Sequence, residues 1–143
     1  MSSLLPFQSA QFTATSPGKR LIVTGAVHGN EVAGMHGIRR VIAEIESGAL
    51  ELQRGSVTLV PITNPKAYAL KRRNGDRNLN RNLTPTDNPT EFEDHIANWL
   101  CPLFARHDAL LDLQSGARGE ELDRLRATDP ALAAELETLL ADA

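Results

Sequence analysis

The stretch that decides the fold is Leu21-Ile-Val-Thr-Gly-Ala-Val-His-Gly-Asn-Glu31. Its first part, through Val27, is mostly apolar and β-branched, which is typical of a strand buried on both faces of a parallel sheet. The glycine that follows His28 lets the chain turn sharply. Beyond the turn, apolar residues at steps of three and four predict a helix that ends at Ser47-Gly48; they are Met35, Ile38, Ile42 and Ile45.

Two more strands and one more helix are predicted downstream. Ser56–Ile62 has the composition of a strand, whose pairing ends or bulges at Pro61. Asn88-Pro-Thr-Glu91 predicts a helix N-terminus capped by Asn88, and the apolar residues of that helix are Phe92, Ile96, Trp99 and Leu103. Asp108–Leu113 predicts a third strand. This order of elements predicts an α/β fold with a mainly parallel or mixed sheet covered by helices.

Composition limits the class of protein. The 143 residues suffice for a single domain, 1–143, and 41% hydrophobic residues exclude disorder throughout. The net charge of −3 argues against a general nucleic-acid or membrane binder. Cys101 is the only cysteine, which excludes an intramolecular disulfide and a cysteine-rich metal site. No basic residue precedes Lys19 and no long apolar run occurs, so we expect a cytoplasmic protein.

The end of the chain differs in composition from the rest. Residues 119–143 contain seven acidic and two basic side chains, and Asp129-Pro130 is a candidate start of a final helix. We therefore divide the domain into an α/β core, 20–116, and an acidic helical tail, 117–143. The tail could cover an open sheet edge; the alternative is a homo-oligomer.

A long irregular loop is predicted from Asn64 to Asn88, and loops of this length in compact domains are usually functional. Residues 66–81 hold six Lys and Arg against one Asp, so we call them the Arg-rich loop. Arginine binds carboxylates through two parallel hydrogen bonds, and the arginines that fit a small acidic ligand are Arg73, Arg77 and Arg81. A merely solvated loop is the alternative. A nucleic-acid partner is not expected, because Tyr68 is the only aromatic residue of the Arg-rich loop that could stack on a base.

Polar side chains follow two of the predicted strands, where the carboxyl ends of a parallel sheet form ligand sites. His28 and Glu31 follow the first strand, and Gln114 follows the third. Imidazole and carboxylate are zinc ligands, and a catalytic zinc has three protein ligands and one open position. The spacing alone also fits a histidine that only caps a helix. The other histidines are interpreted as structural; they are His36, His95 and His107.

Three motifs, taken in order, resemble the succinylglutamate desuccinylase and aspartoacylase family, zinc-dependent relatives of the metallocarboxypeptidases. They are His28-Gly-Asn-Glu31, Arg73-Asn-Gly-Asp-Arg-Asn-Leu-Asn-Arg81 and Asp112-Leu-Gln-Ser-Gly116. The resemblance implies a truncated zinc-carboxypeptidase-like fold. It also implies zinc-dependent hydrolysis of a small anionic substrate such as an N-acyl acidic amino acid.

The resemblance implies a role for individual residues. His28 and Glu31 would be zinc ligands, and Arg73 would be the catalytic arginine that polarises the scissile carbonyl. Asn80 and Arg81 would bind the carboxylate of the substrate.

Two departures from the family pattern leave a second hypothesis open. The family has Asp-Leu-His where this chain has Asp-Leu-Gln, so Gln114 stands at the position of the third zinc ligand. Family members also have a general-base glutamate farther along, and neither Glu120 nor Glu121 is assigned that role. The alternative is an inactive, truncated paralogue that binds an anionic ligand or a partner through the Arg-rich loop.

Overall fold

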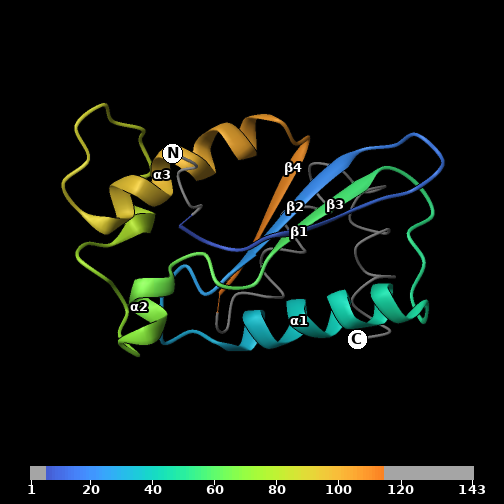
Figure 1. Ribbon diagram of the computed structural model, residues 1–143, viewed down its shortest axis with the longest axis horizontal. Helices are drawn as coiled ribbons and strands as arrows, with labels where there is room; N and C mark the ends of the chain where they lie inside the picture. The colour runs from blue at the N-terminus through green and yellow to red at the C-terminus, as the bar shows by residue number, and fades with distance from the viewer. Residues whose placement is uncertain (1–5, 115–143) are drawn as a thin grey trace, which may run out of the picture.

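The computed structural model describes residues 6–114, which form one mixed sheet between helices (Figure 1). The strand order is β1-β3-β2-β4. The strands are β1 (Ala10–Thr13), β2 (Arg20–Gly25), β3 (Ser56–Val60) and β4 (Ala109–Leu113). Strand β2 pairs in parallel with β3 and β4, and β1 runs antiparallel to β3. The predicted α/β class with a mixed, helix-covered sheet is confirmed.

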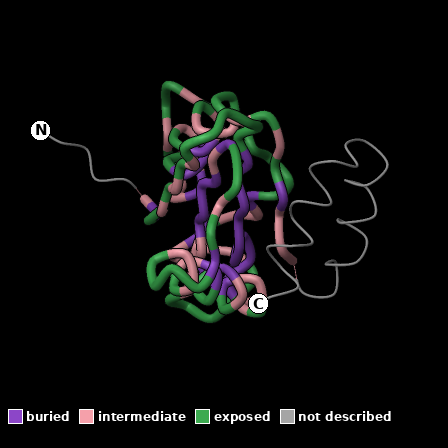
Figure 2. Tube along the Cα trace, turned by 90° about the vertical axis from the view of Figure 1, so that its right-hand side faces the viewer, coloured by how far each residue is buried: buried purple, intermediate pink, exposed green. Residues whose placement is uncertain are grey.

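Two helices cover opposite faces of the sheet and build two hydrophobic clusters (Figure 1). Helix α1 (Ala33–Ser47) packs on the face that carries Leu21, and helix α3 (Phe92–Ala105) packs on the face that carries Ile22. Successive residues of a strand point to opposite faces, so β2 contributes to both clusters. Figure 2 shows the buried segments running through the middle of the molecule. Strand β2 is therefore buried on both faces, as its composition predicts.

Helix α3 differs from the prediction at its start and on its inward face. Its N-cap is Glu91 rather than Asn88, because Glu91 and Asp94 form a reciprocal capping box. The buried side chains include Glu93, whereas the Trp99 residue is 40% exposed. The predicted apolar stripe was wrong at Trp99, since hydrophobic periodicity cannot detect a buried carboxylate on the inward face.

The predicted irregular loop contains two short helices. Helix α2 spans Pro65–Ala69, and a 3-10 turn, η1, spans Leu79–Arg81. Asn64 caps α2 by accepting the backbone N–H of Ala67 at 3.1 Å. An Asn-Pro pair is a recognisable helix start, so the sequence did contain this signal. Strand β1 was also missed, because a four-residue edge strand carries little hydrophobic pattern.

Strand β4 forms one edge of the sheet within residues 6–114, and Leu110 is 42% exposed there. The homo-oligomer stays a prediction, and the acidic tail 117–143 lies outside the described residues. No helix in the described part of the chain combines the length and apolar character needed to cross a membrane.

Candidate active site

His28 follows β2 and is almost completely buried, with 1% of the residue exposed. Its Nε2 lies 3.1 Å from Oδ1 of Asn78. That same atom accepts the backbone N–H of Asn80 at 3.0 Å, which identifies it as the amide oxygen. In the neutral ring Nε2 therefore carries the proton and donates it to Asn78. The other ring nitrogen, Nδ1, is left with a free electron pair.

The free nitrogen of His28 faces a carboxylate. Nδ1 lies 3.4 Å from Oε2 of Glu31, in a geometry that forms no hydrogen bond, and no other partner for Nδ1 occurs among residues 6–114. Two ligands of a tetrahedral zinc, each at roughly 2.0–2.1 Å from the metal, lie about 3.3 Å apart. The separation of these two electron-pair donors therefore fits two ligands of one zinc ion.

Arg73 connects the Arg-rich loop to this pair. Its Nη1 donates to Oε1 of Glu31 at 3.2 Å, and its carbonyl oxygen accepts the backbone N–H of Gly29 at 3.3 Å. The Arg73 side chain stays 54% exposed. The guanidinium therefore lies beside the His28–Glu31 pair and keeps donors available to a ligand.

Gln114 lies at the end of β4 and binds its own strand. Its Nε2 donates to Oδ2 of Asp112 at 2.8 Å, and Oδ1 of Asp112 accepts the Thr24 hydroxyl at 2.9 Å. Gln114 and Asn80 line a cavity of about 280 Å³ whose other lining residues are Thr24, Val27, Leu79, Leu83, Leu100, Phe104, Leu110 and Asp112. Within the described residues, this lining includes neither His28 nor Glu31.

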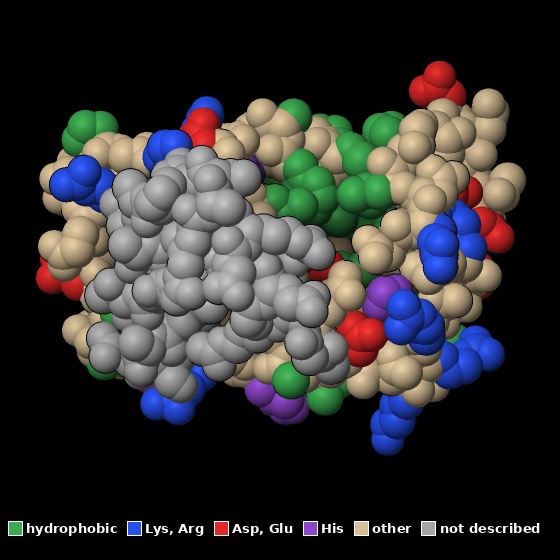
Figure 3. Space-filling view, turned by 180° about the vertical axis from the view of Figure 1, so that it is seen from behind, with side chains coloured by type: hydrophobic (Ala, Val, Ile, Leu, Met, Phe, Trp, Pro, Cys, Tyr) green, Lys and Arg blue, Asp and Glu red, His purple; other side chains and the backbone are tan. Residues whose placement is uncertain are grey.

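The predicted residues thus form two groups. His28, Glu31 and Arg73 are linked by direct contacts, and Asn80 shares a cavity with Gln114. Figure 3 shows hydrophobic side chains gathered in a hollow on one face, with Lys and Arg side chains beside it. No group of three His, Cys, Asp or Glu residues that could hold a metal occurs between residues 6 and 114. A third ligand from this part of the chain would therefore have to be of another type.

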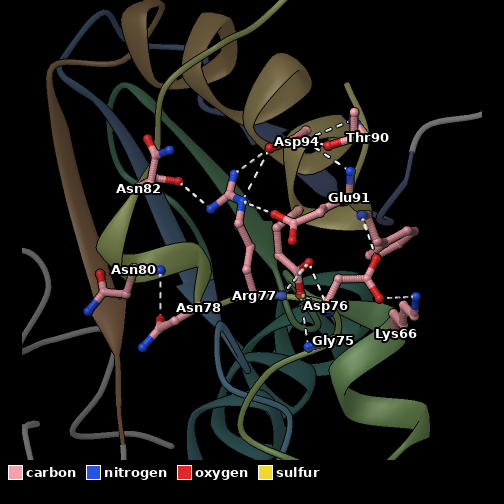
Figure 4. A network of polar contacts seen from close by, with 12 residues as sticks. Lys66, Gly75, Asp76, Arg77, Asn78, Asn80, Asn82, Thr90, Glu91 and Asp94 are labelled. Atoms are coloured by element: carbon pink, nitrogen blue, oxygen red, sulfur yellow. Dashed lines mark hydrogen bonds and ion pairs between the residues drawn. The ribbon is translucent and has the colours of Figure 1, made fainter. Parts of the chain in front are cut away.

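Arg77 does not face a ligand, contrary to the expectation that it grips a carboxylate. Its guanidinium pairs with Asp94 at 2.8 Å and with Glu91 at 3.1 Å, and it donates to the carbonyl of Asn82 at 2.7 Å (Figure 4). Backbone N–H groups of residues 91 and 90, together with Arg77, lower the pKa of Asp94 far below its ordinary value. Arg77 therefore joins the loop to the start of α3. By contrast, Arg81 is exposed and makes no ion pair among the described residues.

Glu93, on helix α3, anchors the Arg-rich loop and was missed by sequence reasoning. Its carboxylate is fully buried and accepts the backbone N–H groups of three consecutive residues, Gly75, Asp76 and Arg77, at 2.8–3.2 Å. Nδ2 of Asn64 adds a hydrogen bond at 3.0 Å. Consecutive backbone N–H groups form a concave anion site, which here is filled by the protein's own carboxylate. Glu93 therefore fixes the path of the Arg-rich loop.

The other histidines do not join the site. His107 binds the Leu103 carbonyl through Nδ1 at 2.6 Å and lies 2.7 Å from the Thr58 hydroxyl through Nε2, which holds α3 on the sheet. His36 and His95 are exposed on the helices.

Comparisons with known proteins point to one family. The model of the succinylglutamate desuccinylase/aspartoacylase catalytic domain matches residues 17–137. A curated human protein, N-acyl-aromatic-L-amino acid amidohydrolase (carboxylate-forming), is 41% identical over 69 residues, covering 48% of this chain and 20% of that protein. The rat protein of the same name is 42% identical over 71 residues, covering 49% and 21%.

Solved structures agree with this match. An aspartoacylase family protein from Mesorhizobium loti is 26% identical, with a TM-score of 0.64 over 76% of this chain and 34% of that chain. A succinylglutamate desuccinylase from Vibrio parahaemolyticus is 27% identical, with a TM-score of 0.60; the match covers 71% of this chain and 37% of that chain. The matched region spans about a fifth of the curated relatives. Because the family model matches most of its residues, the chain belongs to the succinylglutamate desuccinylase/aspartoacylase family.

Proposed function

We propose that this chain carries the metal-binding and substrate-binding part of a zinc-dependent amidohydrolase that hydrolyses N-acyl amino acids. His28 and Glu31 would hold the zinc, and Gln114 stands at the third-ligand position of the family motif. The observation that carries the proposal is the buried Nδ1 of His28, which has no hydrogen-bond partner among the described residues and lies 3.4 Å from Oε2 of Glu31. Two acceptors facing each other repel unless a cation lies between them, so this arrangement suits a metal better than an empty site.

Each remaining residue has a task in this proposal. When bound, zinc supplies positive charge that polarises the scissile carbonyl and acidifies a water molecule. Arg73 gives Glu31 one of the five N–H donors of its guanidinium. Its other donors can bind the negative oxygen that develops during hydrolysis, where charge stabilisation lowers the barrier most.

The substrate carboxylate is assigned to the η1 turn. Asn80 supplies an amide and Arg81 an exposed guanidinium, and arginine binds carboxylates through a two-pronged contact. Charged hydrogen bonds of this kind orient the acyl bond relative to Arg73. The family relation and the N-acyl amino acid substrates of the curated relatives support this assignment.

The test compares the native chain with Gln114→His. A neutral amide is a poorer zinc ligand than imidazole, so the histidine variant should bind zinc about 10- to 100-fold more tightly. Zinc binding is measured by titration, and acid release from N-acetylaspartate and N-acetylphenylalanine is measured with and without chelator. The control, Gln11→His on exposed edge strand β1, should leave zinc affinity unchanged. Equal zinc affinities, or no hydrolysis by either zinc-loaded protein, would contradict the proposal.

A second candidate function is an inactive chain that binds a carboxylate through the Arg-rich loop and η1. It is favoured by one observation: the Gln114 amide nitrogen already donates to Asp112, while Arg81 is exposed. In this case N-acetylaspartate should bind in the presence of chelator. Arg81→Ala should weaken that binding about tenfold, since a charged hydrogen bond is lost. Calorimetry measures the affinity, and Arg39→Ala on α1 is the control. Chelator-sensitive hydrolysis would exclude this candidate.

A further inference from the structure

We propose that a cavity beside the His28–Glu31 turn is a second binding site, which takes a small aromatic molecule carrying one anionic group. The cavity has a volume of about 490 Å³ and lies between the start of α1 and helix α2, which are neighbours in Figure 1. A volume of this size is typical of small-molecule sites. The described lining includes none of the residues proposed to bind zinc or the substrate carboxylate, so the site is separate from the candidate active site and does not depend on the proposed function.

The polar side chains of this cavity have no partner in the described part of the protein. They belong to Asn30, His36, Tyr68 and Lys71. None of the four makes a hydrogen bond or an ion pair within residues 6–114. Together they offer an amide, an imidazole, a phenol hydroxyl and an ammonium group. No aspartate or glutamate occurs among the described lining residues, so the charge of the lysine favours an anionic ligand.

The apolar part of the lining suits an aromatic ring. Val32, Met35 and Ala69 supply aliphatic and thioether surface beside the ring of Tyr68. Aromatic rings stack with an offset or meet edge to face, and a methionine sulfur makes favourable contacts with a ring edge. Met35 is 1% exposed, so packing holds its side chain in place at the cavity wall. A flat apolar body with one anionic group therefore matches both parts of the lining.

Lys71 occupies a backbone position that favours glycine. It follows α2 with a φ of 52°, in the left-handed region, which an L side chain adopts only at a cost in stability. Its N–H donates to the Tyr68 carbonyl at 3.0 Å, and the next N–H along the chain donates to the Ala67 carbonyl at 3.1 Å. These two bonds form the helix-ending motif in which glycine is usual at this position. The lysine therefore strains the turn while placing a cation at the cavity, and strain of this kind is typical of binding sites.

The first experiment measures the binding of phenyl phosphate, which combines a ring with an anion. Backbone ¹H–¹⁵N spectra of the full chain, without metal, are recorded as phenyl phosphate is added. We expect saturable shifts at residues 30, 36 and 71. Inorganic phosphate and phenol should each bind about tenfold more weakly or worse, because each lacks one part of the ligand. Shifts confined to residues 80 and 81, no saturation, or equal affinity for inorganic phosphate would overturn the proposal.

A matched pair of variants tests the cation. Lys71→Ala should weaken phenyl phosphate binding about tenfold, since a charged hydrogen bond is lost. Arg72→Ala removes the same charge from the next residue, which is exposed and does not line the cavity. It should change the affinity by less than about twofold, because exposed charges that do not touch a ligand contribute little. Equal losses in the two variants would show only general attraction to the Arg-rich loop and would overturn the site.

Lys71→Gly separates a binding role from a structural one. Glycine adopts the left-handed conformation without strain, so this variant should unfold a few degrees above the native chain. Its affinity for phenyl phosphate should nevertheless fall as far as that of Lys71→Ala. Thermal unfolding and the same spectra measure the two effects. A glycine variant that binds phenyl phosphate like the native chain, or that unfolds at a lower temperature, would show that the lysine serves the fold and would overturn the proposal.

Discussion

Glu93→Gln should lower the free energy of unfolding by about 3 kcal/mol, within the range for disrupting a buried, charge-assisted hydrogen-bond network. The Glu93 carboxylate accepts the backbone N–H groups of residues 75–77 through both of its oxygens. Glutamine has one amide NH₂ in place of an oxygen, so a donor would face backbone donors. The side chain is fully buried and cannot turn to water. Urea unfolding followed by the fluorescence of Trp99 measures the change.

Glu46→Gln on the exposed surface of α1 is the matched control and should change stability by less than about 0.5 kcal/mol. The Glu93 variant should also become sensitive to limited proteolysis within the Arg-rich loop, because the loop loses its anchor. If Glu93→Gln unfolds at the same urea concentration as the native chain, Glu93 does not hold the loop.

Gly29→Ala should lower the free energy of unfolding by about 3 kcal/mol or more. A clash with backbone atoms cannot be relieved by rotating a side chain. A Cβ at position 29 would lie 2.1 Å from the carbonyl carbon and oxygen of Ala67 and 2.4 Å from the nitrogen of Tyr68. Helix α2 would have to move away from the His28–Glu31 turn. Thermal unfolding measures the loss, and zinc titration should show weaker binding.

Gly37→Ala is the matched control and should stabilise the protein, whereas Gly29→Ala should destabilise it. A Cβ at Gly37 meets no atom within 4 Å, and the residue lies inside α1. Alanine should therefore stabilise the protein by about 0.5–1 kcal/mol through its higher helix propensity. Similar effects of the two substitutions would mean that α2 does not pack against the turn as described.

Much of the fold was predictable because its signals are local. Strand β2 is apolar from Leu21 to Val23, and Pro61 marks the end of β3 at Val60 as predicted. The start of α3 was placed too early because Asn88-Pro89 looks like a cap, whereas the reciprocal bonds of Glu91 and Asp94 decide the boundary. A sequence offers several residues that could cap this helix, and only the folded structure shows which of them does.

Some features of the candidate site could likewise be predicted from the sequence, and others could not. The proximity of His28 and Glu31 follows from their spacing across one turn, so the sequence could predict it. The position of Arg73 against Glu31 depends on a contact across 42 residues. Composition does not distinguish Arg77 from Arg73. Only the fold shows that the guanidinium of Arg77 forms an ion pair with Asp94. The role of Glu93 depends on main-chain donors, which every residue except proline has and which no side-chain motif reveals.

The anchoring of the Arg-rich loop by main-chain groups has a practical consequence for protein engineering. The loop path is specified by the N–H groups of residues 75–77 and by Glu93, so the exposed side chains at Arg72 and Arg81 are not needed to maintain it. A combinatorial library at these two positions should retain the scaffold while varying the charge and shape offered to small molecules. The Arg-rich loop is thus a suitable segment to randomise when variants that bind new ligands are selected.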